Sequence, residues 1–368
     1  MKKTRRKEKK AYFDYTLLFL VLFMVAFGLV MLYSTSYHYA EVHFNDAGYF
    51  LKKQLVSTAI GLVAMFGATM IPYKVWQKIA PLLYVISLGL SVAVIFIGQE
   101  LNGSKRWLKI GGFSFQPSEL AKIAIIVFVS YYICNAPKSM NKLKNIMKTI
   151  AFTLPLVGVI AVNNLSSAII VLAIGIVIIF VASPKYIHFA VPAVILGGAG
   201  TAFAVFFSYR FERIKFWLHP ELLDASSQTI QGLYALGSGG WFGKGLGESI
   251  QKMGSLPEAQ NDMIFSVICE ELGILGALGV ILLFALLIWR FMVIATNSPD
   301  LFGSFLVIGI MAHIAIQVIL NIAVVTNSIP NTGVTLPFIS YGGTAVIFLL
   351  GEMGVALSVS RGIRLEAE

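Results

Sequence analysis

Residues 256–273 read LPEAQNDMIFSVICEELG and join a polar, proline-containing segment to an apolar run that continues to about residue 289. About 20 apolar residues in a helix span a lipid bilayer, so this run is long enough to cross a membrane. Carboxylates are costly at such a depth. The stretch therefore predicts a membrane helix and leaves four acids to explain: Glu258, Asp262, Glu270 and Glu271.

The rest of the chain has the same apolar character. Of its 368 residues, 57% are hydrophobic and only 12% are charged. This composition excludes a soluble globular domain and indicates a polytopic membrane protein. In hydrocarbon only helices or closed barrels satisfy the backbone, and the apolar runs lack the alternation of a barrel strand. We therefore predict an all-α fold.

The apolar runs predict about ten transmembrane helices. They lie at residues 13–34, 51–71, 79–98, 117–134, 147–162, 166–182, 187–208, 263–289, 301–326 and 335–359. We expect a basic tail at residues 1–12, a single membrane domain at residues 13–361 and a second tail at residues 362–368. The membrane domain would include a large extracytoplasmic segment, residues 209–262, between the seventh and eighth helices.

The N-terminal stretch MKKTRRKEKK is strongly basic, and the positive-inside rule places it in the cytoplasm. The apolar run that follows is too long for a signal peptide and lacks a small-x-small cleavage site, so we interpret it as the first membrane helix. Most of the 28 Lys and Arg then face the cytoplasm. Both termini are expected there.

Several cations fall on the outer side against this bias. They are Lys105, Arg106 and Lys109 before the fourth helix, and Arg210, Arg213, Lys215, Lys244 and Lys252 in segment 209–262. Their position suggests an anionic ligand at the outer face. The alternative is that long translocated loops escape the rule and their cations are merely solvated. No nucleic-acid partner is expected, because membrane flanks account for most of the positive charge.

Segment 209–262 offers two further patterns. Its first part contains RFERIKFWL, which is typical of a basic amphipathic helix lying in the membrane interface, and structural anchoring is its simplest interpretation. Its second part contains the glycine-rich stretch GSGGWFGKGLG. A phosphate loop ending at Lys244 would need glycine at Ser238, so a turn-rich connector is favoured over a nucleotide cradle, although its amides could still bind an anion.

Two more segments place polar groups at membrane depth. Glu119 and Lys122 lie three residues apart on one helix face, where a structural ion pair is favoured over catalysis. The stretch NSIPNTGVTLPFISYGG, between the last two helices, has irregular backbone that is tolerated only inside protein or beside a cavity. Cys134 and Cys269 show no spacing typical of a disulfide framework or a zinc site.

Four stretches together resemble the SEDS family (shape, elongation, division and sporulation), with members FtsW, RodA and SpoVE. They are NGSKRWLKIGGFSFQPSELAK, ALGSGGWFGKGLGES, LPEAQNDMIFSVICEELG and NTGVTLPFISYGG, and they follow the family's order across nearly the whole chain. The resemblance is stronger to FtsW or SpoVE than to RodA, whose pattern usually has Arg where this chain has Ala259.

The resemblance implies a ten-helix enzyme of the bacterial cytoplasmic membrane that polymerises lipid II into glycan strands at the outer face, with a role in cell division favoured. It also implies a partner, a class B penicillin-binding protein acting as transpeptidase, and contact with other division-complex membrane proteins. Asp262 matches the acidic residue that the family uses as its catalytic base.

The chain departs from the family pattern at two places. Gln260 and Asn261 stand where the family commonly has a His-Thr pair, so no histidine can act beside Asp262. The sequence VNNL, residues 162–165, replaces the Glu-Pro-Asp-Leu of many members. Functions assigned to those acids elsewhere do not carry over to this chain.

The chemistry implied by this resemblance requires a base for a sugar hydroxyl and positive charge for a departing lipid diphosphate. Asp262 is the predicted base. The predicted substrate contacts are Lys105, Arg106, Arg210, Arg213, Lys244, Glu258 and Ser340. A divalent cation, Mg²⁺ or Mn²⁺, could share the charge, although no metal-binding motif is present.

Alternatives remain for both the site and the function. Asp262 precedes a helical run and could simply cap it, while Glu270 and Glu271 are interpreted as structural groups. A lipid II flippase could use the buried ionisable residues Glu119, Lys122 and Glu352 as a polar path, but no inverted repeat is visible. A scaffold for a division or elongation complex is compatible with either activity.

Overall fold

The computed structural model describes residues 10–101, 104–110, 113–195, 197–198, 214–224 and 227–365. Within these residues, nine helices are long and apolar enough to span a membrane. They are α1 (Tyr15–Phe44), α2 (Tyr49–Met70), α3 (Lys74–Ile97), α4 (Pro117–Asn135), α5 (Leu143–Asn163), α6 (Leu165–Ala182), α10 (Ile264–Thr296), α11 (Leu301–Val325) and α12 (Gly343–Gly362). The predicted all-α membrane fold is confirmed.

Each of these nine spans overlaps one predicted run. Half of the predicted seventh span, residues 187–208, lies outside the described residues. Its beginning is a short apolar helix at Tyr186–Ile195, which opens with the 3-10 turn η2 (Tyr186–Phe189). Two other short turns are η1 (Pro137–Asn141) and η3 (Pro220–Leu222).

Two helix boundaries differ clearly from the prediction. Helix α1 continues ten residues past the predicted end, because no helix breaker occurs before Asn45, whose backbone adopts the left-handed conformation. The last helix was predicted from residue 335, but residues 335–342 form turns and α12 begins only at Gly343. Pro337 and the glycines before α12 interrupt the helix within an otherwise apolar stretch.

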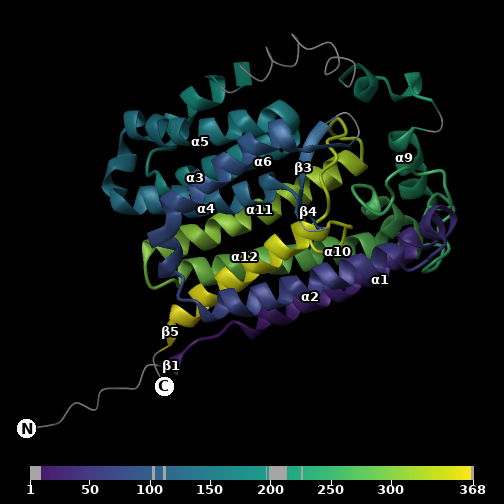
Figure 1. Cartoon of the computed structure of the whole chain (residues 1–368), viewed down its shortest axis with the longest axis horizontal. Helices are drawn as coiled ribbons and strands as arrows, with labels where there is room; N and C mark the ends of the chain where they lie inside the picture. Colours follow the sequence, from purple (N-terminus) through teal and green to yellow (C-terminus); the bar gives the residue numbers. More distant parts are fainter. Residues whose placement is uncertain are drawn as a thin grey trace, which may run out of the picture.

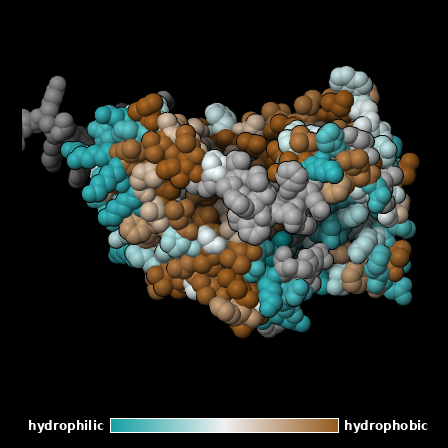
Figure 2. All heavy atoms as spheres, turned by 90° about the horizontal axis from the view of Figure 1, so that it is seen from above, coloured by the Kyte–Doolittle hydropathy of each residue, from teal (hydrophilic) through white to brown (hydrophobic). Residues whose placement is uncertain are grey.

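The helices run side by side along the long axis of the molecule (Figure 1). Helices α4, α11 and α12 are the most buried spans and form the centre of the bundle. Helix α2 packs along α12, and α4 contacts α3, α6 and α11. The surface carries an apolar band with hydrophilic residues gathered toward both ends (Figure 2). Exposed apolar side chains on the spanning helices include Phe19, Phe23, Val63, Phe96 and Leu282, as expected of helices that face lipid.

The two ends of the described chain meet at one end of the bundle. Strand β1 (Lys10–Ala11) pairs antiparallel with β5 (Arg364–Leu365). Asp14 caps α1 and accepts a hydrogen bond from Arg290 on α10 at 2.5 Å. Helix α9 (Gln228–Ser238) lies at the opposite end of the bundle (Figure 1). The predicted extracytoplasmic segment and the chain ends are therefore on opposite sides.

A small sheet that was not predicted from the sequence precedes α4. Strands β2 (Gln99–Leu101), β3 (Ser104–Ile110) and β4 (Phe113–Phe115) form an antiparallel sheet in the order β2-β3-β4. Strand β3 carries the predicted substrate contacts Lys105 and Arg106. Pro117 then occupies the first turn of α4, where its missing N–H is not needed.

Candidate active site

Helix α10 is broken in its N-terminal third. Gly273 has φ 67° and ψ −167°, which are not helical values, and the helix resumes at Ile274. The glycine loop, residues 239–252, packs into this break. The Ile274 N–H donates to the Gly240 carbonyl at 2.9 Å, and the Lys244 N–H donates to the Glu270 carbonyl at 2.9 Å. The loop thus supplies partners that the broken helix lacks.

The close approach of the two backbones explains the glycines. A Cβ atom at Gly239 would collide with the Cys269 carbonyl, and one at Gly243 would collide with the backbone of α10 at Glu271. A Cβ at Gly273 would collide with the loop in turn. The glycine cluster is thus a packing device, in agreement with the predicted connector, and some of its amides already donate to α10.

Glu270 and Glu271 fasten the same loop to the bundle. The Lys244 ammonium lies 2.6 Å from Glu270, which also accepts from the Ser249 hydroxyl at 2.5 Å. The Lys252 ammonium lies 2.5 Å from Glu271, and both of these side chains are fully buried. Glu271 also accepts from the hydroxyl of Ser34 on α1. These contacts give both glutamates a structural role, and they place the charge of Lys244 on Glu270.

Asp262 lies just before the first turn of α10 but does not cap it. The helix begins at Ile264, and its N-cap is Met263, which makes no side-chain capping hydrogen bond. The capping interpretation of Asp262 is therefore wrong. Its carboxylate Oδ1 instead accepts a hydrogen bond from Gln228 Nε2 at 2.9 Å. The side chain is only 6% exposed.

The surroundings of Asp262 favour its protonated form. Burial raises the pKa of its carboxyl from 3.8 to about 6, and the charge of Glu258 adds to the rise. Hydrogen bonds from its own backbone N–H and from Gln228 act in the opposite direction. A carboxyl with this pKa is mostly ionised at neutral pH and takes up a proton more readily than an ordinary aspartate.

Three amide side chains that the sequence did not single out hold Asp262 in place. Asn331 Nδ2 donates to Gln228 Oε1 at 2.8 Å, which continues the hydrogen bond to the carboxylate. Asn321 Nδ2, fully buried on α11, donates to the carbonyls of Asp262 and Val334, each at 2.8 Å. The only available signal was the polar spacing of α11, where Gln317 and Asn321 interrupt an apolar helix one turn apart.

The segment between α11 and α12, residues 326–342, passes beside the carboxylate. A Cβ on Gly333 would lie 3.9 Å from Asp262 Oδ2, and the Tyr341 N–H donates to the Gln260 carbonyl at 2.9 Å. Within this segment Ser340 is buried, and its Oγ accepts from the Leu336 N–H at 2.8 Å. Ser340 thus stabilises the turn, and a contact between Ser340 and substrate stays a prediction.

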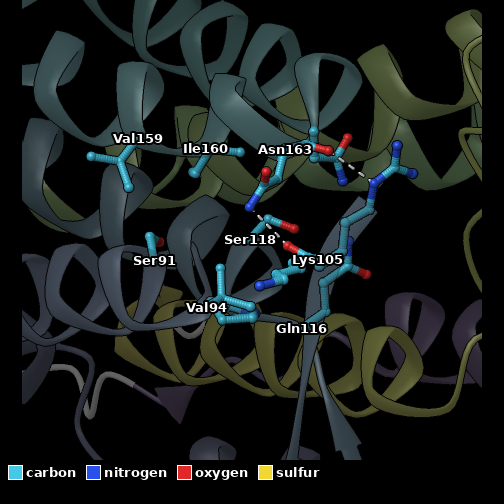
Figure 3. Close-up of a pocket in the computed structure, with 11 residues that line it drawn as sticks. Ser91, Val94, Lys105, Gln116, Ser118, Val159, Ile160 and Asn163 are labelled. Carbon is cyan, nitrogen blue, oxygen red and sulfur yellow. Dashed lines mark hydrogen bonds between the residues drawn. The ribbon is translucent and has the colours of Figure 1, made fainter. Parts of the chain in front are cut away.

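The predicted cations of β3 lie against the turn between α5 and α6. Arg106 Nε donates to the Asn163 carbonyl at 3.0 Å, and Asn163 Nδ2 donates to the Lys105 carbonyl at 3.0 Å. Figure 3 shows Lys105 and Asn163 beside a small cavity that Ser91 and Ser118 also line. Neither serine hydroxyl has a hydrogen-bond partner within the described residues. Asn163, which lies in the stretch that departs from the family pattern, thus connects β3 to the turn between α5 and α6.

A chain of contacts joins this basic hairpin to Asp262. Ser166, near the start of α6, donates to the Thr332 carbonyl at 2.7 Å, and the neighbouring Asn331 leads through Gln228 to the carboxylate. Glu258 is exposed, has φ 53°, and accepts a hydrogen bond from Asn261. The predicted contacts Arg210 and Arg213 lie outside the described residues.

The predicted pair of Glu119 and Lys122 belongs to a longer buried chain. Lys122 Nζ lies 2.9 Å from Glu119 and 3.3 Å from Gln317 Oε1. The same oxygen lies 2.9 Å from His313 Nε2, and His313 Nδ1 lies 2.8 Å from Glu352. These side chains join α4, α11 and α12 and bond to one another. Such a chain is typical of a structural polar core and not of an open path for a polar headgroup. This arrangement weakens the flippase interpretation.

Gln317 also connects the buried chain to the site. Its Nε2 donates to the Thr335 carbonyl at 3.0 Å, in the segment that passes beside Asp262. Among the described residues no three His, Cys, Asp or Glu side chains gather in a group that could hold a metal ion.

These features define a polytopic helical membrane protein in which a buried carboxyl of raised pKa, that of Asp262, lies at the end of the bundle opposite the described chain ends. The profile of the FtsW/RodA/SpoVE family, described as cell cycle proteins, matches residues 15–364. The chain therefore belongs to that family.

The relatives agree with this assignment over the full length. The chain is 40% identical to the stage V sporulation protein E of Bacillus subtilis (strain 168), with 96% of this chain and 98% of the relative covered. It is 37% identical to the probable peptidoglycan glycosyltransferase FtsW of Trichlorobacter lovleyi, with 98% and 96% covered. The predicted likeness to FtsW or SpoVE is confirmed.

Solved structures share the fold. One, described as structural coordination of polymerization and crosslinking by a peptidoglycan synthase complex, has a TM-score of 0.80 at 28% identity, with 95% of this chain and 98% of the other covered. The rod shape determining protein RodA of Thermus thermophilus has a TM-score of 0.69 at 28% identity, with 95% and 97% covered.

Proposed function

We propose that this protein is a peptidoglycan glycosyltransferase that polymerises lipid II into glycan strands and releases undecaprenyl diphosphate. The observation that carries the proposal is Asp262, a buried carboxylate that caps no helix and has a pKa of about 6. FtsW relatives of similar length are named probable peptidoglycan glycosyltransferases. A base with these properties suits the activation of a sugar hydroxyl.

The reaction needs one proton acceptor and one site of positive charge. The hydroxyl of one lipid-linked sugar loses its proton to the Asp262 carboxylate while its oxygen attacks the anomeric carbon of a second sugar. The bond from that carbon to the lipid diphosphate breaks as the new glycosidic bond forms. Gln228 orients the carboxylate throughout, because its amide holds Oδ1. A positioned base of this kind contributes about 10² to 10⁴ in rate.

The departing diphosphate develops negative charge. Lys105 and Arg106 on β3 would receive it, with Arg210 and Arg213 as further contacts predicted from the sequence. Guanidinium groups suit this task, since they bind phosphate oxygens in a bidentate manner. A divalent cation, Mg²⁺ or Mn²⁺, would add positive charge at the diphosphate, and removal of divalent cations with a chelator would then slow polymerisation.

We place the Asp262 end of the bundle at the outer face of the bacterial cytoplasmic membrane and both termini in the cytoplasm. Two features support this orientation. The N-terminal stretch is strongly basic, as cytoplasmic flanks are. Strands β1 and β5 pair, so the two chain ends share one side, opposite α9. Lipid II would meet the site from the outer leaflet.

The expected protein partner is a class B penicillin-binding protein that crosslinks the strands. The support is the fold shared with a chain of a peptidoglycan synthase complex that coordinates polymerization and crosslinking. Other membrane proteins of a division complex are further partners that the family resemblance implies. Lateral contact between membrane helices would join such partners to the apolar band in Figure 2.

Glycan synthesis in detergent tests this function against the flippase alternative. The purified protein and its transpeptidase would be mixed with lipid II in micelles, with penicillin present to block crosslinking. Micelles have no second face, so transport cannot produce the signal. We expect long glycan strands on a gel. Absence of strands, together with movement of lipid II across liposome bilayers that hold the protein, would replace the proposal by the flippase function.

A further inference from the structure

The glycine loop exposes large apolar side chains that the proposed chemistry does not use. Trp241 is 67% exposed and Phe242 is 82% exposed, and Leu246 and Ile250 are also exposed. Four such side chains close together in sequence are unusual on a surface that faces water. The position of the loop along α10 indicates what covers them.

The hydrogen bonds to α10 set the level of the loop in the membrane. Gly240 and Trp241 accept from Ile274 and Leu275, immediately after the break at Gly273. Beyond the break, residues 274–296 extend about 34 Å at about 1.5 Å per residue. That length matches a hydrocarbon core of about 30 Å. The break and the loop therefore lie at the outer boundary of the hydrocarbon.

The apolar surface of the loop continues that of α10. Ile274, Leu275 and Leu278 are exposed on the helix just below the loop. These side chains belong to a membrane-spanning segment, so lipid is their natural neighbour. Trp is enriched at membrane interfaces, where its ring sits among headgroups with its apolar part toward the acyl chains. The same surroundings suit Trp241, with Phe242 beside it.

We propose that the glycine loop lies in the interface at the outer face of the cytoplasmic membrane, with Trp241 and Phe242 in contact with phospholipids. Two ion pairs then connect this seat to the site: Lys244 with Glu270, and Lys252 with Glu271. Lipid contact at the loop thereby holds the outer part of α10 at a fixed height.

The height of Asp262 relative to the membrane suits a lipid-linked substrate, which is the substrate of the proposed function on which this step rests. The Asp262 carbonyl accepts from Asn321 on α11 at 2.8 Å. Asn321 lies about 30 Å from the start of α11 at about 1.5 Å per residue, near the same boundary of the hydrocarbon as the break at Gly273. Asp262 thus stands at the membrane boundary, within reach of the headgroup of a membrane-bound diphosphate lipid.

Tryptophan fluorescence in bilayers tests the seat without relying on activity. The full-length protein and its Trp241→Phe variant would be placed in phosphatidylcholine bilayers with bromine either near the headgroup or deep in the acyl chains. The difference between their emissions isolates Trp241. Leu282, exposed on α10 about 14 Å beyond the break at about 1.5 Å per residue and so near the middle of the hydrocarbon, serves as a deep reference through the change Leu282→Trp made in the Trp241→Phe variant.

We expect shallow bromine to remove most of the Trp241 emission and deep bromine to affect the emission added by Leu282→Trp more strongly. Iodide in the water should have little effect on Trp241. Quenching by iodide without quenching by bromine would overturn the proposal, because the loop would face water. Insensitivity to both, with a change in emission when the transpeptidase is added, would also overturn it by assigning the surface to a protein partner.

A second variant tests the link to the site. Phe242→Ser should lower polymerisation in bilayers several-fold while leaving polymerisation in detergent micelles unchanged, since micelles impose no fixed height. An equal activity in bilayers would contradict the height argument. A wild-type protein without polymerase activity would refute the proposed function and leave the fluorescence result to stand alone.

Discussion

Replacing Asp262 by Asn should stabilise the folded protein at neutral pH. Burial raises the pKa of the Asp262 carboxyl to about 6 from an ordinary 3.8, so the ionised form favours the unfolded chain. The difference is about two pKa units, worth about 3 kcal/mol once the carboxyl is fully ionised in both states. Asn has the same shape, can still accept from Gln228, and carries no charge to bury.

The sign of the effect depends on pH in a defined way. Below about pH 4 the carboxyl is protonated in both states, so wild type and Asp262→Asn should unfold with nearly equal free energies. Between about pH 4 and pH 6 the wild type loses stability relative to the variant as pH rises. Denaturant titration of the purified proteins in detergent, at about pH 4 and about pH 8, measures the difference in their unfolding free energies.

Asp300 provides a control of opposite sign. Burial alone would raise the pKa of Asp300, but the Gly303 N–H, the Tyr73 hydroxyl and Lys74 together lower it. Its ionised form therefore stabilises the fold above the ordinary pKa, and Asp300→Asn should destabilise the protein at neutral pH. A destabilising effect of Asp262→Asn at about pH 8, or a difference from wild type that does not change with pH, would refute the reasoning.

Three further predictions concern the supports of the site. Lys252→Met leaves Glu271 buried without its counter-charge and should lower the unfolding free energy by about 3 to 5 kcal/mol. The added change Glu271→Gln should restore part of this loss, and equal stabilities of the single and double variants would contradict the prediction. Gln228→Leu removes a hydrogen bond that lowers the pKa of the Asp262 carboxyl, so the acid limb of the polymerisation rate against pH should move to higher pH. An acid limb that does not move would show that Gln228 does not act on the base. Gly243→Ala should lower the unfolding temperature more than Gly237→Ala, because a Cβ at Gly237 meets nothing within 4 Å while one at Gly243 collides with α10; similar unfolding temperatures would argue against the close packing.

The membrane helices could be predicted because hydrocarbon imposes a simple rule on length and composition. Each of the nine described spans overlaps a predicted apolar run. The rule does not detect a break inside an apolar stretch, and this is why residues 335–342 were predicted as helix although they form turns. The strands were missed because β2 and β4 have only three residues each and the seven residues of β3, SKRWLKI, do not alternate strictly between apolar and polar.

The site was predictable only in part. Asp262 stands out in the sequence because a carboxylate directly precedes a membrane helix and matches a family position. Its partners come from distant parts of the chain: Gln228 lies 34 residues before it, and Asn321 lies 59 residues after it. Only the packing of α9, α11 and the segment before α12 brings these amides together. No local spacing rule could have found them.

The two glutamates of α10 show what the sequence could and could not supply. Their depth in an apolar helix indicated structural groups. The sequence could not indicate their partners, because Lys244 and Lys252 belong to a loop whose path depends on the break at Gly273. Lys244 was predicted to contact substrate because the predicted topology puts this cation on the outer side. The structure places its ammonium 2.6 Å from Glu270.

The most direct test of the central claim is glycan-strand formation from lipid II by Asp262→Asn, assayed with the transpeptidase partner beside wild type and the capping-site control Asp300→Asn. The variant retains the shape of the side chain but cannot accept a proton as a carboxylate does. We predict that it remains folded and makes no polymer, while Asp300→Asn still makes strands. Polymer formation by folded Asp262→Asn at the wild-type rate would contradict the claim and place the base elsewhere.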